Sequence, residues 1–247
     1  MVVGQFNPAF VRFNDAALVL HSILTESLGS TISYGWIGDY ALVLQDENLI
    51  LKGSLKDYDR IDCVVHGITT IRICELLHDH REFSDLAEID CAELRDDYTD
   101  FSWSDNDNGD RVKIRLYCDP PYTNLRPSAN LSTTLVKANA GYTQGLVNIV
   151  SPIHLFKEKI LEASRRQDSR DPEAIQYLVR EHGKHIQPHA QGLSLLYVGL
   201  TIKRYPSLLQ LFADLGVNIE EASRASSFVN LDDDNDIPGA VWASILS

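Results

Sequence analysis

The sequence predicts an α+β protein in which a mixed sheet with helices is followed by a helical domain. Before residue 150, short apolar runs that end near glycine alternate with longer segments whose apolar residues recur at helical spacing. After the Ser151-Pro152 step, only the helical spacing remains. No internal repeat is present. We therefore expect an α/β domain over residues 1–150 and an α-helical domain over residues 151–247.

The first part begins with a predicted helix that Asn14 caps, because asparagine readily accepts a hydrogen bond from the first helical turn. Gly38 starts a second helix directly after a strand, and Gly67 ends a buried strand. An Asp/Asn/Gly turn at 105–110 lies between two apolar runs, which is typical of a hairpin. The expected helices cover 15–28, 38–44 and 70–80, and the expected strands cover 31–36, 61–65, 101–103, 111–118 and 146–150. The stretch 120–145 is expected to be rich in loops.

The second part begins at Pro152, which fits the first turn of a helix because proline lacks the backbone N–H that this turn leaves unbonded. Asp171 and Pro172 form the next predicted start, with Asp171 as the cap. The expected helices cover 152–166, 171–182, 192–203, 207–214 and 219–226.

Composition narrows the function classes. The net charge is −13, with 35 acidic against 22 basic residues, so the surface should repel phosphate backbones and non-specific nucleic-acid binding is not expected. No apolar run is long enough for a membrane helix. The four cysteines are widely spaced, which favours reduced thiols in a cytoplasmic protein. The turn at 105–110 resembles a calcium loop but lacks the closing glutamate, since Leu116 stands there, and a solvated turn is favoured.

Charged residues crowd at the start of the strand that begins near Ile61. A site that transfers nucleotides with magnesium needs two carboxylates one residue apart on a strand, so that both side chains point the same way. Arg60 and Asp62 have this spacing, so a cation occupies one position of the pair.

Further motifs surround this strand. Their residues are Ile37-Gly38-Asp39-Tyr40-Ala41-Leu42 at a helix start, Lys56, Tyr58, Arg60, Ile61 and Asp62 at the strand, Arg115 on the strand 112–116, the helix 151–159 with Lys159, and Arg165, Arg170-Asp171 and Ile175. In this order they resemble the nucleotidyltransferase superfamily with the polymerase-beta-like fold, in particular the minimal nucleotidyltransferases and abortive-infection toxins. The resemblance covers roughly residues 15–182.

The resemblance implies a nucleotidyltransferase-like mixed sheet and a cleft where aspartates hold magnesium against a triphosphate. In this sequence Arg60 and Arg115 stand where the family has aspartates, and Asp39 replaces a glycine. Two unit charges about 4 Å apart interact by about 4 kcal/mol at an effective dielectric constant of 20, and a divalent ion doubles this energy. The replacements should therefore prevent ordinary metal binding, and we expect no cofactor.

The first functional hypothesis is a degenerate family member that binds a small polar or anionic ligand without metal. If such a protein is an enzyme, the expected reaction is a metal-free cyclisation or isomerisation. The candidate catalytic residues are Asp62, Asp59, Arg60 and Arg115. The candidate ligand-binding residues are Gly38, Asp39, Tyr40, Lys56, Tyr58, His154, Lys159, Arg165 and Arg170.

Three other interpretations stay open. Arg60 or Arg115 can pair with Asp62 and leave a purely structural ion pair. An active, magnesium-dependent nucleotidyltransferase can use Asp59 with Asp62, although their spacing of three requires a bend in the strand. A non-enzymatic interaction protein can engage a basic partner through its acidic surface. The sequence predicts neither the oligomeric state nor a membrane partner.

Overall fold

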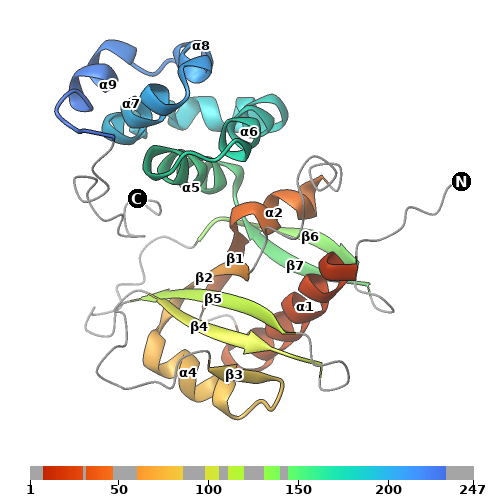
Figure 1. Ribbon diagram of the computed structural model, residues 1–247. Helices are drawn as coiled ribbons and strands as arrows, with labels where there is room; N and C mark the ends of the chain where they lie inside the picture. The colour runs from red at the N-terminus through yellow and green to blue at the C-terminus, as the bar shows by residue number, and fades with distance from the viewer. Residues whose placement is uncertain are drawn as a thin grey trace, which may run out of the picture. The chain divides into compact units, whose positions relative to one another are not determined.

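The computed structural model describes residues 8–29, 32–46, 60–85, 98–105, 111–119, 131–139 and 144–231 (Figure 1). The chain divides into two compact units, Met1–Val150 and Ser151–Ser247, and each is described by itself. Among the described residues, no helix has the length and apolar character needed to cross a membrane.

The first unit is built on one mixed sheet. Its described strands are β1 Ser33–Ile37, β2 Arg60–Thr69, β3 Phe83–Asp85, β4 Tyr98–Trp103, β5 Val112–Asp119, β6 Thr133–Asn139 and β7 Gln144–Val150. They lie in the order β3-β4-β5-β2-β1-β7-β6. Strand β2 runs parallel to β5 and antiparallel to β1, while β1 runs parallel to β7. The α+β class and the mixed sheet predicted from the sequence are confirmed.

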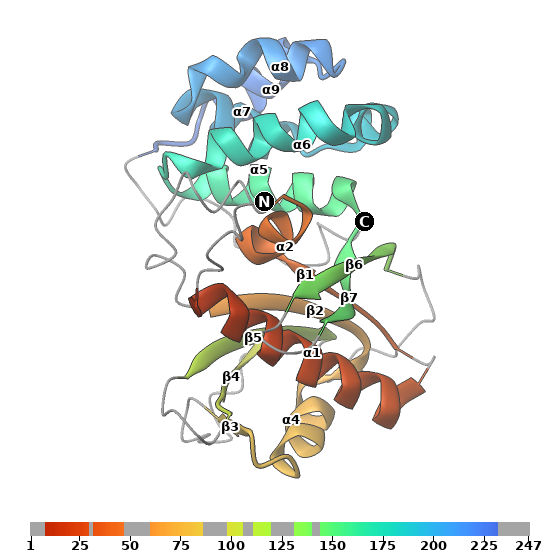
Figure 2. The ribbon, with the colours of Figure 1, turned by 90° about the vertical axis from the view of Figure 1, so that its right-hand side faces the viewer.

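The two faces of the central strands differ in chemistry because successive side chains of a strand point to opposite sides. On one face of β2 and β5 the side chains are buried and almost all apolar, as at Ile61, Cys63, Ile114 and Leu116. Helix α1, Pro8–Leu28, contacts β5, β6 and β7, and Figure 2 shows it lying across the sheet. Helix α4, Thr70–His78, contacts β2, β3, β4 and β5. The other face of β2 and β5 carries the polar side chains.

Helix α1 begins seven residues before the predicted start at 15, so the prediction of Asn14 as its cap is wrong. The Asn14 side chain is instead fully buried. Its amide nitrogen donates to the backbone oxygen of Asn139 at 2.8 Å, and its amide oxygen accepts from the Tyr40 hydroxyl at 2.9 Å. These two bonds connect α1 to β6 and to α2, Gly38–Gln45.

Strands β3 and β6 were not predicted, and β2 runs well past its expected end. Strand β6 lies in the region that was expected to be loop. It was not predicted because Leu135 and Lys137 are both exposed, so the sequence lacks the alternation of a half-buried strand. The three-residue strand β3 is too short to give a pattern. Strand β2 passes the predicted stop at Gly67 and reaches Thr69, with an irregular register after Val65.

The second unit is helical. Its described elements are α5 Pro152–Arg165, α6 Arg170–Ile186, η3 Gln187–Gly192, α7 Leu195–Arg204, η4 Pro206–Leu208, α8 Leu209–Asp214 and α9 Ile219–Ala225. Pro152 is the first residue of α5, as predicted. Asp171 lies inside α6 rather than at its cap, which is Ser169, and it is buried. The prediction of Asp171 as a cap is therefore wrong.

Helices α7 and α9 cross closely at Gly199. A methyl group there would overlap the backbone oxygen of Ala222 and the side-chain oxygen of Ser226. Because backbone atoms of a packed helix move little, we expect Gly199→Ala to lower the free energy of unfolding by about 2–3 kcal/mol. Gly183→Ala on α6 is the matched control, since its new methyl group would meet only Val179 at 3.8 Å.

Chemical denaturation of the full chain measures both glycine variants. The control is expected to gain about 0.5–1 kcal/mol, because alanine favours the helix over glycine. Equal stability of the Gly199→Ala protein and the wild type would show that the two helices do not pack as described.

Candidate functional site

A row of charged side chains crosses the polar face of the sheet. Asp62 of β2 lies opposite Arg115 of β5, and Arg115 lies opposite Asp100 of β4. Arg60 precedes Asp62 by two residues on the same strand, so both side chains are on this face. The row therefore alternates acid, base, acid across three neighbouring strands, with a second base beside the first acid.

Arg60 forms an ion pair with Asp62. The Arg60 Nε donates to Asp62 Oδ1 at 2.9 Å, and the two side chains are 36% and 19% exposed. In the part of the chain that the structure describes, this is the only hydrogen bond of the Arg60 side chain. The two terminal amino groups of Arg60 thus have no hydrogen-bond partner among these residues. A guanidinium in this state can still bind an anion through its terminal N–H groups.

Arg115 is held by Asp100 and not by Asp62. Its Nε and Nη2 donate to the two carboxylate oxygens of Asp100 at 2.7 and 2.8 Å, which is a bidentate pair. Its guanidinium carbon also lies 4.0 Å from the centroid of the Tyr98 ring. The hydrogen bonds that Arg115 donates to Asp100 raise the pKa of Arg115 above its ordinary value. Arg115 is therefore a permanent, fixed cation between the two acids.

Tyr117 completes the row of side chains on β5. Burial raises the pKa of Tyr117 above 10, and the negative charge of Asp62 raises it further, while Arg115 and Arg60 lower it. The phenol therefore stays neutral at physiological pH. Its ring lies 5.7 Å from the ring of Tyr98, centroid to centroid. The two rings, tilted by 57° to each other, add aromatic surface next to the guanidinium groups.

The described residues of this face do not fit a magnesium ion. Neighbouring strands are about 4.8 Å apart, so Asp62 and Asp100 stand about 10 Å apart at their Cα atoms, with Arg115 between them. Magnesium binds oxygen ligands at about 2.1 Å and needs them to converge. Among the described residues, no group of three His, Cys, Asp or Glu side chains could hold a metal. Asp59 lies outside the described residues.

The other predicted site residues of the first unit that the structure describes lie on α2 and not in this row. Gly38 begins α2 with a positive φ of 69°, and Asp39 follows it, half-buried. Tyr40 is 4% exposed, and its ring packs against Trp36 in the core. Its side chain is therefore placed for packing rather than for ligand contact. The candidates outside the described residues are Lys56, Tyr58 and Asp59.

Two of the predicted cations of the helical unit, Lys159 and Arg170, pair with acidic residues of the same unit. Lys159 is 1% exposed and donates to Glu162 Oε2 at 2.6 Å. Arg170 binds Asp168, with its Nη2 at 2.6 Å from Oδ2. Arg165 is exposed near the end of α5.

His154 lies near the start of α5. Its Nδ1 is 2.8 Å from the Ser151 hydroxyl oxygen. Burial lowers the pKa of His154, and the charges of Lys157 and His189 lower it further. The imidazole is thus predominantly neutral at pH 7.

Sequence reasoning missed Tyr98, Asp100 and Tyr117. These residues occupy alternate positions on the β4–β5 hairpin, and the antiparallel register pairs Asp100 with Arg115. Alternation of polar and apolar residues at 100–103 is the signal that could have found Asp100. The expected strand began at 101 and left Asp100 outside it.

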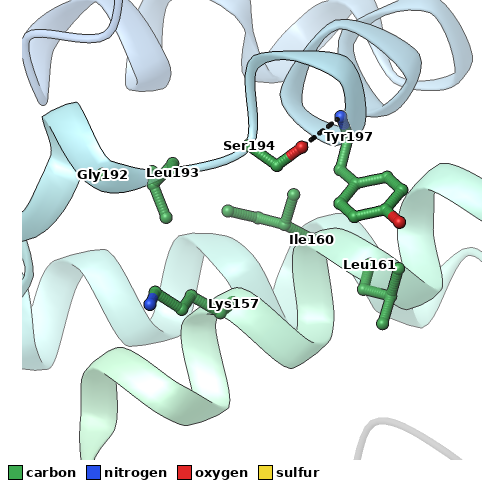
Figure 3. A pocket seen from close by; sticks show the side chains of 7 residues that line it. All are labelled: Lys157, Ile160, Leu161, Gly192, Leu193, Ser194 and Tyr197. Atoms are coloured by element: carbon green, nitrogen blue, oxygen red, sulfur yellow. Dashed lines mark hydrogen bonds between the residues drawn. The ribbon is translucent and has the colours of Figure 1, made fainter. Parts of the chain in front are cut away.

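A small cavity opens in the helical unit between α5 and the segment that leads into α7 (Figure 3). It has a volume of about 30 Å³. Its walls are mainly apolar, and Lys157 lies on its α5 side. Ligand pockets typically measure about 300–1,000 Å³, so this cavity has room for water rather than for a nucleotide.

Comparisons with known proteins bear on the fold. No protein-family model and no curated protein matches this sequence. The chain is similar to the crystal structure of an antigenic nucleotidyltransferase-like protein from Paracoccidioides brasiliensis, with a TM-score of 0.50 and 18% identity over 81% of this chain and 91% of that chain. It is also matched to MenT4, a nucleotidyltransferase toxin from Mycobacterium tuberculosis, with a TM-score of 0.45 and 11% identity over 93% and 88% of the two chains. The first likeness confirms the predicted nucleotidyltransferase-like fold.

Proposed function

We propose that this nucleotidyltransferase-fold protein binds a small polar or anionic ligand on the polar face of its sheet without a metal ion. The observation that carries the proposal is the Arg60–Asp62 ion pair at 2.9 Å. A guanidinium neutralises the carboxylate that a magnesium ion would need, and it still has terminal amino groups to offer a ligand.

The chemistry of the face favours an anionic, partly flat ligand. Arg60 supplies N–H donors, and Arg115 supplies positive charge from a fixed position. The Tyr98 and Tyr117 rings offer a surface for stacking, since aromatic rings stack on flat groups. Phosphate and carboxylate groups match the planar fork of an arginine.

The catalytic version of the proposal is a metal-free proton transfer, as in an isomerisation or a cyclisation. Asp62 is the carboxylate next to Arg60, and it can take a proton from a bound ligand and return it elsewhere on the same ligand. Arg60 and Arg115 then stabilise the negative charge that develops on the ligand. No redox partner and no second substrate is needed for such a step.

A cytoplasmic location is part of the proposal. It is supported by Cys63, Cys74 and Cys118, which are reduced in the structure, because reduced cysteines are typical of proteins in that compartment.

Calorimetric titration with pyrophosphate, ATP, GTP, CTP and UTP in EDTA tests the proposal. We expect at least one of these anions to bind the wild type, and Arg60→Gln to weaken that binding about ten-fold, because one charge-assisted pair of hydrogen bonds is lost. Arg72→Gln is the control, since Arg72 is an exposed arginine of the same unit that pairs with Glu75.

Binding that needs magnesium and disappears in Asp62→Asn would overturn the proposal and favour the active nucleotidyltransferase. Labelled nucleoside triphosphates distinguish that alternative further. Metal-dependent transfer of label, lost in both Asp59→Asn and Asp62→Asn, is its expected signature.

A further inference from the structure

Three basic side chains of the helical unit lie near the start of α5 and interact electrostatically. His154 and Lys157 are three residues apart on this helix, so they lie on the same side of it. His189 belongs to η3 and precedes Gly192 by three residues, which is one turn of a 3₁₀-helix. Lys157 and Gly192 line the same small cavity (Figure 3). The charges of Lys157 and His189 both act on His154, so the three bases are neighbours in space, and we call His154, Lys157 and His189 the basic cluster.

The basic cluster has no acidic partner among the described residues. Lys157 makes no hydrogen bond or ion pair with any of them. The hydrogen bond of His154 is the one between Nδ1 and the Ser151 hydroxyl, so its Nε2 is available. His189 is exposed and has no such contact in the described part of the chain. In a chain of net charge −13, a group of three bases that form no ion pair with an acid among the described residues is unexpected.

The bases also oppose one another's charge. Burial lowers the pKa of Lys157. The charges of Lys157 and His189 lower the pKa of His154, after burial. An anion placed among them would remove this repulsion. Helix α5 begins at Pro152, two residues before His154, so the positive end of its dipole strengthens the same field.

We propose that the basic cluster binds a phosphoryl group, either as inorganic phosphate or as a phosphate monoester. A phosphoryl group has three oxygens that can each accept a hydrogen bond, and the cluster offers one donor from each of its three side chains. A phosphoryl group carries between one and two negative charges at neutral pH, which suits a site with one lysine and two imidazoles. This site belongs to the helical unit and shares no residue with the row of Arg60 and Asp62, so it goes beyond the proposed function.

Proton NMR of the histidine C2 protons tests the proposal with sodium phosphate as the probe. The full-length Arg60→Gln protein is the starting protein, so that the sheet face of the first unit does not contribute. Titration at constant pH and constant ionic strength is expected to shift the signals of His154 and His189 along a saturating curve. His154→Asn and His189→Asn assign the two signals.

Further variants in the same background measure the contribution of each base. Lys157→Gln is expected to weaken phosphate binding about ten-fold, because the most basic group of the cluster is lost, and each histidine variant about three-fold. Lys184→Gln and His185→Asn on α6 are matched controls, since both side chains are exposed. They should bind phosphate as the starting protein does. If Lys157→Gln fails to fold, the double variant His154→Asn/His189→Asn carries the test.

Parallel titrations with glycerol 2-phosphate and with inorganic phosphate identify the source of the phosphoryl group. Tighter binding of the ester supports the site and assigns it to a phosphate monoester, and tighter binding of the free ion supports it and assigns it to phosphate. The proposal is overturned if neither compound shifts the two histidine signals. It is also overturned if Lys157→Gln and the histidine variants bind as tightly as the controls.

Discussion

Replacing Arg60 by aspartate is expected to give the protein an affinity for Mn²⁺ about 100-fold higher than that of the wild type. The change removes the guanidinium that pairs with Asp62 and places two carboxylates one residue apart on β2. Both side chains then point to the same face of the sheet and can converge on one ion. Two unit charges at short range interact by about 4 kcal/mol. This energy, reduced by the partial exposure of both side chains, is enough for the gain in affinity.

Electron paramagnetic resonance of free Mn²⁺ measures the affinity of the Arg60→Asp protein. Arg72→Asp, which changes the charge of the same unit equally at an exposed position, is the control and should stay at the wild-type level. Without metal, the two carboxylates repel each other, so Mn²⁺ is also expected to raise the Tm of Arg60→Asp but not of the control. Equal Mn²⁺ affinity in Arg60→Asp and Arg72→Asp would mean that Arg60 does not occupy a latent metal position.

The second large effect is expected in the helical unit, where two neighbouring aspartates should respond to pH with opposite sign. Asp171 is 2% exposed, accepts a hydrogen bond from the Tyr205 hydroxyl at 3.3 Å and lies 3.6 Å from Arg166. Burial, the largest cause, raises its pKa to about 6. Asp168 is bound by Arg170, and this hydrogen bonding, as the largest cause, lowers its pKa to about 2.

The sign for Asp171 follows from its raised pKa. Between about pH 4 and pH 6 the folded protein holds a proton that the unfolded chain has lost, so stability falls as pH rises through this window. At pH 7 the ionised, buried carboxylate therefore costs stability. Asp171→Asn removes the charge and keeps an acceptor for Tyr205, and we expect it to raise the free energy of unfolding by about 2 kcal/mol at pH 7, with no gain near pH 4.

The sign for Asp168 is the reverse. Its stabilising contribution is complete above about pH 4 and is lost as pH falls toward 2, because the folded protein then must take up a proton. Asp168→Asn is expected to lower the free energy of unfolding by about 1–2 kcal/mol at pH 7, with a smaller loss at low pH. Urea denaturation of both variants from pH 2 to pH 8 checks the pair. A shift of both variants in the same direction at pH 7 would contradict the assignment.

Much of the fold could be predicted from local patterns. Period-two alternation on β2 predicts that Arg60 and Asp62 share a face, and the proline at 152 predicts the start of α5. The start of α1 could not be predicted from local patterns, because asparagine is a typical cap residue. The Asn14 side chain is buried through hydrogen bonds with Asn139 and Tyr40, which come from distant parts of the chain. Edge strand β6 also gives no clear alternation.

Which arginine pairs with which aspartate depends on the register between strands, so local sequence patterns cannot predict it. The sequence leaves open whether Arg60 or Arg115 pairs with Asp62. In the structure Arg60 does so, and Arg115 takes Asp100 from the neighbouring strand of the hairpin. Pairing between β4 and β5 depends on their register, and a shift of one residue would send Asp100 to the opposite face.

Binding of Mn²⁺ to the wild-type protein in the presence of ATP measures most directly whether a guanidinium has replaced the metal. Paramagnetic resonance spectra of wild type and Asp62→Asn, recorded with the same Mn²⁺ and ATP, are expected to be identical, because Asp62 already pairs with Arg60. A population of Mn²⁺ that the wild type immobilises and Asp62→Asn releases would contradict this and would place a working metal at Asp62.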